Sequence, residues 1–268
     1  MIQYHLYPGY KKRIVTFSYD DGHPNDERLI ALFDAYGVRA TFHLNGQKYV
    51  GASDEKLRAL RERYKNHEIA CHTFSHGWPA RMPMQSVIRE TIEDRMILEK
   101  IAGYPVTGMS YPSGSFDENV ARAMSDCGIR YSRTTRDTNK FLLPEDPLTW
   151  HPTCHHRFAL ELCDKFLENL DSEWTNPLFY IWGHSHELRT VEDWAHIEAI
   201  LKKLAGNDKI WYATNGEIID YMNAQKQVLI SADETIFTNP TAITVLLERD
   251  KTEYISVPAG TTVTIPKK

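Results

Sequence analysis

The stretch RIVTFSYDDGH, residues 13–23, joins a short apolar run to a cluster of carboxylates. Residues 13–18 are rich in β-branched and aromatic side chains, and this composition predicts a buried strand. Two adjacent aspartates, Asp20 and Asp21, follow at the strand end, and Gly22 permits a sharp turn behind them. Taken alone, such a cluster is typical of a polar turn that caps the next helix, so its meaning depends on the rest of the chain.

The order of strand and then helix repeats along the chain. Apolar runs predict strands at 13–18, 38–43, 68–71, 106–111, 129–132, 148–151, 178–182 and 210–212. Segments with helical period predict helices at 25–36, 53–64, 85–102, 117–127, 158–170 and 191–205. This alternation indicates an α/β protein with a mostly parallel sheet covered by helices. An open sheet and a closed barrel both fit, and the lack of a glycine-rich nucleotide loop after any strand favours the barrel.

The last 42 residues, 227–268, differ in character from the rest. They contain short β-branched runs separated by turn signals such as Asn239-Pro240 and Pro258-Ala259-Gly260, which predict a small antiparallel appendage. So short a segment does not form a stable core of its own. We therefore expect it to pack on the main domain or, in a homo-oligomer, on a partner chain. The predicted domains are therefore a barrel at 1–226 and a β-rich appendage at 227–268.

Composition excludes several classes of protein. The chain has 268 residues, with 31 Lys and Arg against 36 Asp and Glu, and its longest basic run is only residues 11–13, which disfavours nucleic-acid binding. No apolar stretch approaches the roughly 18 residues that a membrane span needs. The start shows no secretory pattern, and four scattered cysteines do not form a disulfide scaffold, so we expect a reduced, cytoplasmic setting.

A second polar cluster follows the predicted strand at 68–71. His72 and His76 are spaced so that a tight turn or helix places both imidazoles on one face, which suits two ligands of one metal ion. The spacing alone is equally typical of two surface histidines. Together with a carboxylate, two imidazoles form an open ligand set that leaves positions for water or substrate.

Two more clusters follow later strands. The run YIWGHSHE, residues 180–187, ends the predicted strand at 178–182, and SYPSGSF, residues 110–116, follows the one at 106–111. Taken alone, the first run is typical of a packed structural histidine, and the second is typical of a simple loop. However, four unusual polar clusters all lie just past the carboxyl ends of different predicted strands, where barrel enzymes gather their active sites.

These residues resemble the motifs of the polysaccharide deacetylase family, carbohydrate esterase family 4. The family's F-D-D-G motif is similar to residues 19–22, its H-[ST]-x-x-H motif to residues 72–76, and its late L-x-x-H motif to residues 181–184. The matches follow the family's order over 18–184. The resemblance implies an irregular (β/α) barrel of seven to eight strands and metal-dependent removal of acetyl groups from carbohydrates.

The resemblance also implies a role for each matching residue. Asp20 corresponds to the catalytic base, and Asp21, His72 and His76 to the ligands of one divalent metal ion. His184 corresponds to the catalytic acid. Zinc is the expected ion, and cobalt, manganese and iron suit the same ligands.

One motif departs from the family pattern. The family's R-x-P-Y-G motif appears as residues 110–114, with Ser110 where the family has an arginine oriented against the base. Arg133 or Arg136, from the next strand end, is expected to supply that charge. A backbone amide near Ser113 is expected to stabilise the oxyanion. The candidate substrate contacts are Tyr111, Ser113, Arg133, His186 and Glu187.

The substrate is less well defined than the site. An acetylated sugar or oligosaccharide is expected, and the missing export signal makes a small intracellular sugar at least as plausible as a wall polymer. One alternative is a C–N hydrolase that acts on a non-sugar amide with the same site. Another is a catalytically inactive, carbohydrate-binding barrel, to which the missing motif arginine gives some weight.

Overall fold

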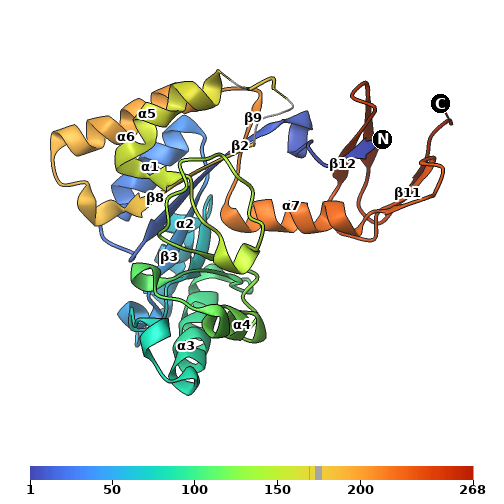
Figure 1. Ribbon diagram of the computed structural model, residues 1–268. Coiled ribbons are helices and arrows are strands. Elements are labelled where there is room, and N and C mark those ends of the chain that lie inside the picture. The colour runs from blue at the N-terminus through green and yellow to red at the C-terminus, as the bar shows by residue number, and fades with distance from the viewer. Residues whose placement is uncertain (169, 173–176, 268) are drawn as a thin grey trace.

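A curled parallel sheet forms the centre of the molecule in the computed structural model, which describes residues 1–168, 170–172 and 177–267 (Figure 1). Its strands run in the order β6-β5-β4-β3-β2-β8-β7, and β9 pairs with β2 beside β3. The strands are β2 (Arg13–Asp20), β3 (Ala40–Leu44), β4 (Glu68–Cys71), β5 (Gly108–Ser110), β6 (Tyr131–Arg133), β7 (Cys154–His155), β8 (Leu178–His184) and β9 (Ile210–Tyr212).

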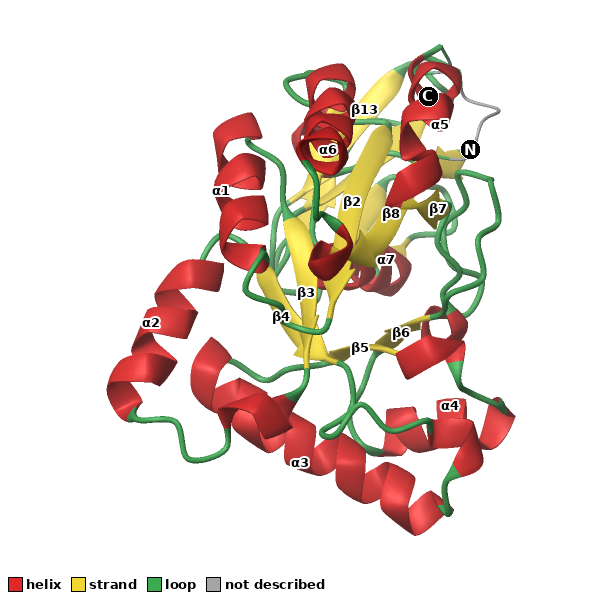
Figure 2. Ribbon diagram, turned by 90° about the vertical axis from the view of Figure 1, so that its left-hand side faces the viewer, coloured by secondary structure: helices red, strands yellow, loops and turns green. Residues whose placement is uncertain are grey.

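The sheet curls without closing fully. Its edge strands β6 and β7 are not paired with each other, and beyond β6 lies a single parallel bridge between Arg133 and Trp150. The helices pack around the outside of the curled sheet (Figure 2). The predicted α/β class and irregular (β/α) barrel are therefore confirmed.

The helices agree closely with the sequence pattern. They are α1 (Asp26–Tyr36), α2 (Asp54–Tyr64), α3 (Met84–Ala102), α4 (Glu118–Asp126), α5 (His156–Leu167), α6 (Val191–Leu204) and α7 (Asn215–Gln227). A capping box of Thr190 and Asp193 starts α6. The predicted helix 158–170 corresponds to α5, and residue 169 near its predicted end lies outside the described residues.

One predicted strand is wrong, and one strand and one α-helix of the barrel part were not predicted. Residues 148–151 do not form a strand, because Pro147 starts a 3₁₀ turn, η5 (Pro147–Thr149), whose amide at Leu148 donates to the Asp146 side chain at 2.9 Å. The two-residue strand β7 and the helix α7 had no counterpart in the prediction.

The C-terminal segment forms two three-stranded antiparallel sheets, as predicted, and we call them the β module. One sheet has the order β1-β12-β13 and the other β10-β11-β14. The strands are β1 (Ile2–Gln3), β10 (Leu229–Ile230), β11 (Ile236–Thr238), β12 (Val245–Arg249), β13 (Glu253–Val257) and β14 (Thr262–Thr264). Because β1 belongs to this module, both chain termini lie there (Figure 1).

Helix α7 connects the barrel to the β module. At its start the amides of Asn215 and Gly216 donate to Thr41 Oγ1 at 2.9 Å and to Glu68 Oε2 at 2.8 Å, on β3 and β4. A Cβ atom at position 216 would lie 2.4 Å from the Glu68 carboxylate, so this close approach requires glycine. At the other end Ala224 packs into the apolar core of the β module.

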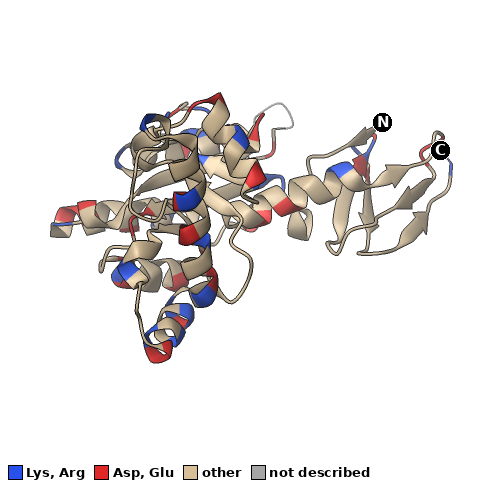
Figure 3. Cartoon of the chain, turned by 90° about the horizontal axis from the view of Figure 1, so that it is seen from below, with Lys and Arg blue, Asp and Glu red and all other residues tan. Residues whose placement is uncertain are grey.

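Positions of Lys and Arg and positions of Asp and Glu are interspersed along the ribbon of the barrel and of α7 (Figure 3). Among the described residues, no helix combines the length and the apolar character that crossing a bilayer requires.

Candidate active site

The parallel register brings the predicted site residues to one level. Asp20, the last residue of β2, is the register partner of His43 on β3 and of His184 on β8. On the adjoining part of the sheet, Ser110 of β5 is the partner of Arg133 of β6. Because parallel strands all end on the same side, these polar side chains meet at the carboxyl edge of the curled sheet.

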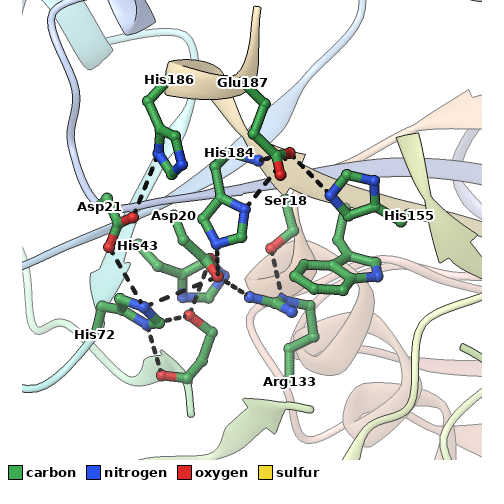
Figure 4. A network of polar contacts seen from close by, with 12 residues as sticks. Ser18, Asp20, Asp21, His43, His72, Arg133, His155, His184, His186 and Glu187 are labelled. Carbon is green, nitrogen blue, oxygen red and sulfur yellow. Dashed lines mark hydrogen bonds and ion pairs between the residues drawn. The ribbon is translucent and has the colours of Figure 1, made fainter. Parts of the chain in front are cut away.

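Asp20 is a buried carboxylate with strong partners (Figure 4). It forms an ion pair with the Arg133 guanidinium, and the Ser110 hydroxyl donates to its Oδ1 at 3.0 Å. Burial alone would raise the pKa of Asp20, but the charge of Arg133, with smaller contributions from nearby histidines, holds it well below its usual range. Asp20 is therefore ionised at any physiological pH.

The arginine that faces Asp20 is Arg133, and Arg136 is not part of this ion pair. Arg133 is fully buried, donates from Nε to Ser18 Oγ at 3.2 Å, and lies over the Trp182 ring with its guanidinium carbon 4.4 Å from the ring centroid. The structure thus provides a positive charge against Asp20 from β6, while Ser110 occupies the place of the family's arginine on β5.

The other aspartate faces the two histidines of the second motif. Asp21 Oδ1 lies 3.7 Å from His72 Nε2 and 3.4 Å from His76 Nε2. Bonds of about 2.0–2.1 Å to a tetrahedral zinc ion place neighbouring ligand atoms about 3.4 Å apart. The observed spacings are close to that value, and the longer one exceeds the range of a hydrogen bond.

The contacts of the second ring nitrogen of His72 also indicate that this histidine is suited to bind a metal ion. Its Nδ1 lies 2.9 Å from the Ser110 carbonyl and 2.7 Å from the Ser110 hydroxyl. A proton on Nδ1 satisfies both acceptors and leaves the Nε2 lone pair directed towards Asp21, the arrangement typical of metal-bound histidine. Burial lowers the pKa of His72 to about 4, which also keeps this ring neutral. The residues present therefore fit a divalent metal ion.

The backbone around these ligands is unusual. Asp21, Thr73 and His76 all have positive φ values, at 78°, 59° and 60°. Non-glycine residues rarely adopt this conformation, and its cost is typical of sites whose geometry serves a function.

His184 approaches the same oxygen of Asp20 as His72 does. Its Nε2 is 3.9 Å from Asp20 Oδ2, and its Nδ1 is 3.6 Å from Oε2 of Glu187, in the turn η6 (Ser185–Glu187). Burial would lower the pKa of His184, but the two carboxylates outweigh it and raise the pKa above its usual value. Glu187 in turn contacts His155 Nε2 at 2.9 Å and Arg157 at 3.0 Å.

The remaining predicted residues have different surroundings. His186 Nδ1 lies 3.6 Å from Asp21 Oδ2, and both residues line a cavity of about 360 Å³ with His23, Lys48 and His76. Ser113 lies in the turn η4 (Pro112–Gly114) with a positive φ of 54°. Tyr111 is not brought to this cavity: it is fully buried, and its hydroxyl donates to the Leu148 carbonyl at 2.9 Å.

Sequence reasoning missed three residues of this site. His43 is fully buried beside Asp20, Ser18 supports Arg133, and the hydroxyl of Ser110 links Asp20 to His72. A signal existed for His43, because a lone imidazole in the apolar run ATFHL of β3 falls at the same strand end as Asp20.

With the fold and the site described, comparison with known proteins shows what this chain is similar to. A sequence model of the family described as polysaccharide deacetylase matches residues 8–132. The probable peptidoglycan-N-acetylglucosamine deacetylase of Arthroderma benhamiae is 29% identical over 133 residues, covering 48% of this chain and 30% of the fungal protein. The recognition of the polysaccharide deacetylase family in this sequence is thereby confirmed.

Two solved structures show the same fold. The family 4 acetyl xylan esterase from Clostridium thermocellum, in complex with a cobalt ion, has a TM-score of 0.53 at 16% identity and covers 78% of this chain and 91% of its own. A family 4 pseudoenzyme from Bacillus anthracis has a TM-score of 0.54 at 16% identity, covering 78% of this chain and 66% of its own. This chain spans less than half the length of the curated relatives it matches.

Proposed function

We propose that this protein is a metal-dependent hydrolase that removes an acetyl group from a carbohydrate. The observation that carries the proposal is that two adjacent aspartates, Asp20 and Asp21, have different surroundings. Asp21 belongs to a three-residue set with the spacing of metal ligands, and Asp20 is an ionised carboxylate between that set and His184. Deacetylation needs a metal-activated water, a base and an acid, and all three are available within this arrangement.

Asp21, His72 and His76 would hold the divalent ion. Bound there, the ion lowers the pKa of its water ligand and polarises the acyl carbonyl. Asp20 takes the proton of the attacking water. Its low pKa makes it a weak base, so this role would depend on the bound ion to make the water more acidic. Arg133 and the Ser110 hydroxyl hold the carboxylate in a fixed orientation.

His184 acts at the other end of the reaction. Glu187 and Asp20 favour its protonated form, and the protonated ring donates a proton to the departing amine or alkoxide. The amide of the η4 turn near Ser113 stabilises the oxyanion, a role taken over from the family rather than from a contact in this structure.

An acetylated sugar or oligosaccharide is the proposed substrate class, since the matched relatives are named as deacetylases of peptidoglycan and chitin. The alternative of an inactive, carbohydrate-binding barrel keeps its place because the same fold includes a pseudoenzyme. The intact set of Asp20, Asp21, His72, His76 and His184, together with the Arg133 charge, favours the enzyme.

The test measures metal content and acetate release together. Elemental mass spectrometry should find about one tightly bound divalent ion per chain, lost when His72 and His76 are both replaced by alanine. Asp20→Asn should keep the ion and lose acetate release by at least about 10²-fold, the usual contribution of a general base. Turnover by Asp20→Asn near the wild-type rate would contradict the base assignment, and metal-loaded protein that releases no acetate from any acetylated sugar would favour the binding protein.

A further inference from the structure

A second group of metal-ligand side chains lies beside the proposed active site. His184, His186 and Glu187 are close in sequence, and each offers one ligand atom within 4.8 Å of the other two. All three residues are partly exposed, with side-chain exposures of 24%, 37% and 15%, so an ion can reach them from solvent. They lie around the bend from β8 into η6 (Figure 4).

The spacing of these atoms resembles that of the first site. His184 Nδ1 lies 3.6 Å from Glu187 Oε2, which is too long for a good hydrogen bond and close to the edge of a zinc tetrahedron of about 3.4 Å. His184 Nδ1 is also buried and without a hydrogen-bond partner. A buried ring nitrogen of this kind costs free energy unless something binds it, and a cation placed between the two atoms would do so.

The surroundings of Glu187 fit a ligand carboxylate. His155 Nε2 and Arg157 hold its two oxygens at 2.9 Å and 3.0 Å, and ligating carboxylates are usually hydrogen-bonded in this way. His155 and His156 form another group with Glu187 whose ligand atoms lie within 4.8 Å of one another. In that group, however, His155 Nδ1 accepts from the Arg157 amide at 3.4 Å, which places the ring proton on Nε2, towards Glu187. Glu187 Oε2 also accepts from the His184 amide at 3.3 Å, which holds the carboxylate beside the His184 ring.

We propose that a second zinc-like ion binds His184, His186 and Glu187, and that at metal excess it inhibits the enzyme. The inhibition rests on the proposed function, because an ion on Nδ1 would replace the proton there, so the ring could not form the imidazolium that acts as the acid for the leaving group. The positive charge of Arg157 and of an ion at Asp21 opposes a second cation, so the second site is weaker than the first and fills only at excess. Its nitrogen ligands select zinc, cobalt or nickel over magnesium.

The experiment counts the sites by titration. Protein stripped by a chelator is titrated with Zn²⁺ in a calorimeter, and bound metal is measured after dialysis by elemental mass spectrometry. Wild type should bind two ions per chain in two steps. His186→Ala and Glu187→Gln should keep the tight step and lose the weak one, whereas His72→Ala should lose the tight step. His196→Ala removes an imidazole outside both groups, on α6, and should still bind two.

Activity gives the second readout. Acetate release by wild type should rise up to one equivalent of Zn²⁺ and fall as the second binds, and the fall should be absent from His186→Ala when each variant is scaled to its own maximum. Saturation of wild type at one ion, or an unchanged weak step in both His186→Ala and Glu187→Gln, would overturn the site. Two ions without a fall in activity would overturn the inhibition. A complete lack of acetate release would instead count against the proposed function, and the stoichiometry would still decide whether the second site exists.

Discussion

Two histidine–carboxylate contacts near Asp20 are built differently. On one side, Asp21 lies 3.4 Å from His76 and 3.7 Å from His72, whose other nitrogen has a carbonyl partner. On the other side, Glu187 lies 2.9 Å from His155, whose other nitrogen accepts a proton from a backbone amide. The first geometry leaves a lone pair facing the carboxylate, and the second places a hydrogen between the atoms. The difference teaches that the partner of the remote ring nitrogen distinguishes a histidine free to bind a metal ion, such as His72, from one that donates a hydrogen bond to its carboxylate, such as His155.

Removing the positive charge of Arg133, which pairs with Asp20, should have the largest effect. Arg133→Met leaves the buried Asp20 carboxylate without its counter-ion, so we expect a loss of about 3–5 kcal/mol in unfolding free energy and loss of acetate release. Urea unfolding and an acetate assay measure both. The matched control, Arg136→Met, should change stability by less than about 0.5 kcal/mol, as a substitution away from the ion pair does.

A double variant sharpens this prediction. Ser110→Arg combined with Arg133→Ser returns the arginine to the position that it has in the family motif, and it should recover part of the activity that Arg133→Ser alone loses. If the Arg136 variant were as damaged as the Arg133 variant, the assignment of the counter-ion to Arg133 would be wrong.

Neutralising Glu187 should shift the pH profile. Glu187 and Asp20 raise the pKa of His184, so its protonated form persists below that raised pKa and is lost as pH increases through it. Glu187→Gln removes one of these charges and lowers the pKa. The alkaline limb of kcat should therefore move to lower pH. The pH profile of kcat is measured with one equivalent of metal, so that the proposed second metal site at Glu187 stays empty.

The matched control for this profile is Glu192→Gln on α6, a carboxylate that makes no ion pair with His184. It should leave the alkaline limb in place. An alkaline limb that is the same in wild type and Glu187→Gln would mean that another group donates the proton.

The smallest effect should come from removing the Ser110 hydroxyl, which links Asp20 to His72. Ser110→Ala removes the hydrogen bond to Asp20 and one contact with His72, while the Ser110 carbonyl still accepts from the ring. A single hydrogen bond to a charged group contributes about 1.5–3 kcal/mol, so kcat should fall by about 10- to 100-fold with metal retained. Ser132→Ala, in the neighbouring strand, should have little effect. Loss of the metal from Ser110→Ala would show that the hydroxyl supports the metal-binding residues instead.

Much of the barrel could be predicted because local pattern and final structure agree. The predicted bounds of β4 and β9 match the structure, and the capping box at Thr190 starts α6 as expected. The strand expected at 148–151 failed because a proline and an aspartate side chain favour a turn there, a local competition that apolar composition does not reveal.

Helix α7 escaped prediction for a different reason. Its apolar residues face two cores at once, so it lacks the single apolar stripe by which helices are recognised. The capping box of Thr214 and Glu217 was nevertheless a usable signal for its start.

The site could be predicted only as far as its motifs extend. Asp20, Asp21, His72, His76 and His184 were named from sequence, and the structure brings them together. The choice between Arg133 and Arg136 could not be made, because it depends on which side chain of β6 points inward. That in turn depends on the register of β6 with β5, where Arg133 is opposite Ser110.

Helix α7 also has a consequence for how the molecule unfolds. One end hydrogen-bonds to Thr41 and Glu68 in the barrel, and the other contributes Ala224 to the β module, so neither part can melt without exposing a side of the same helix. The two parts are thermodynamically linked through a shared element, and they should lose structure in one cooperative transition rather than two. The short strands at the ends of the chain thereby contribute to the thermal tolerance of a site that they do not touch.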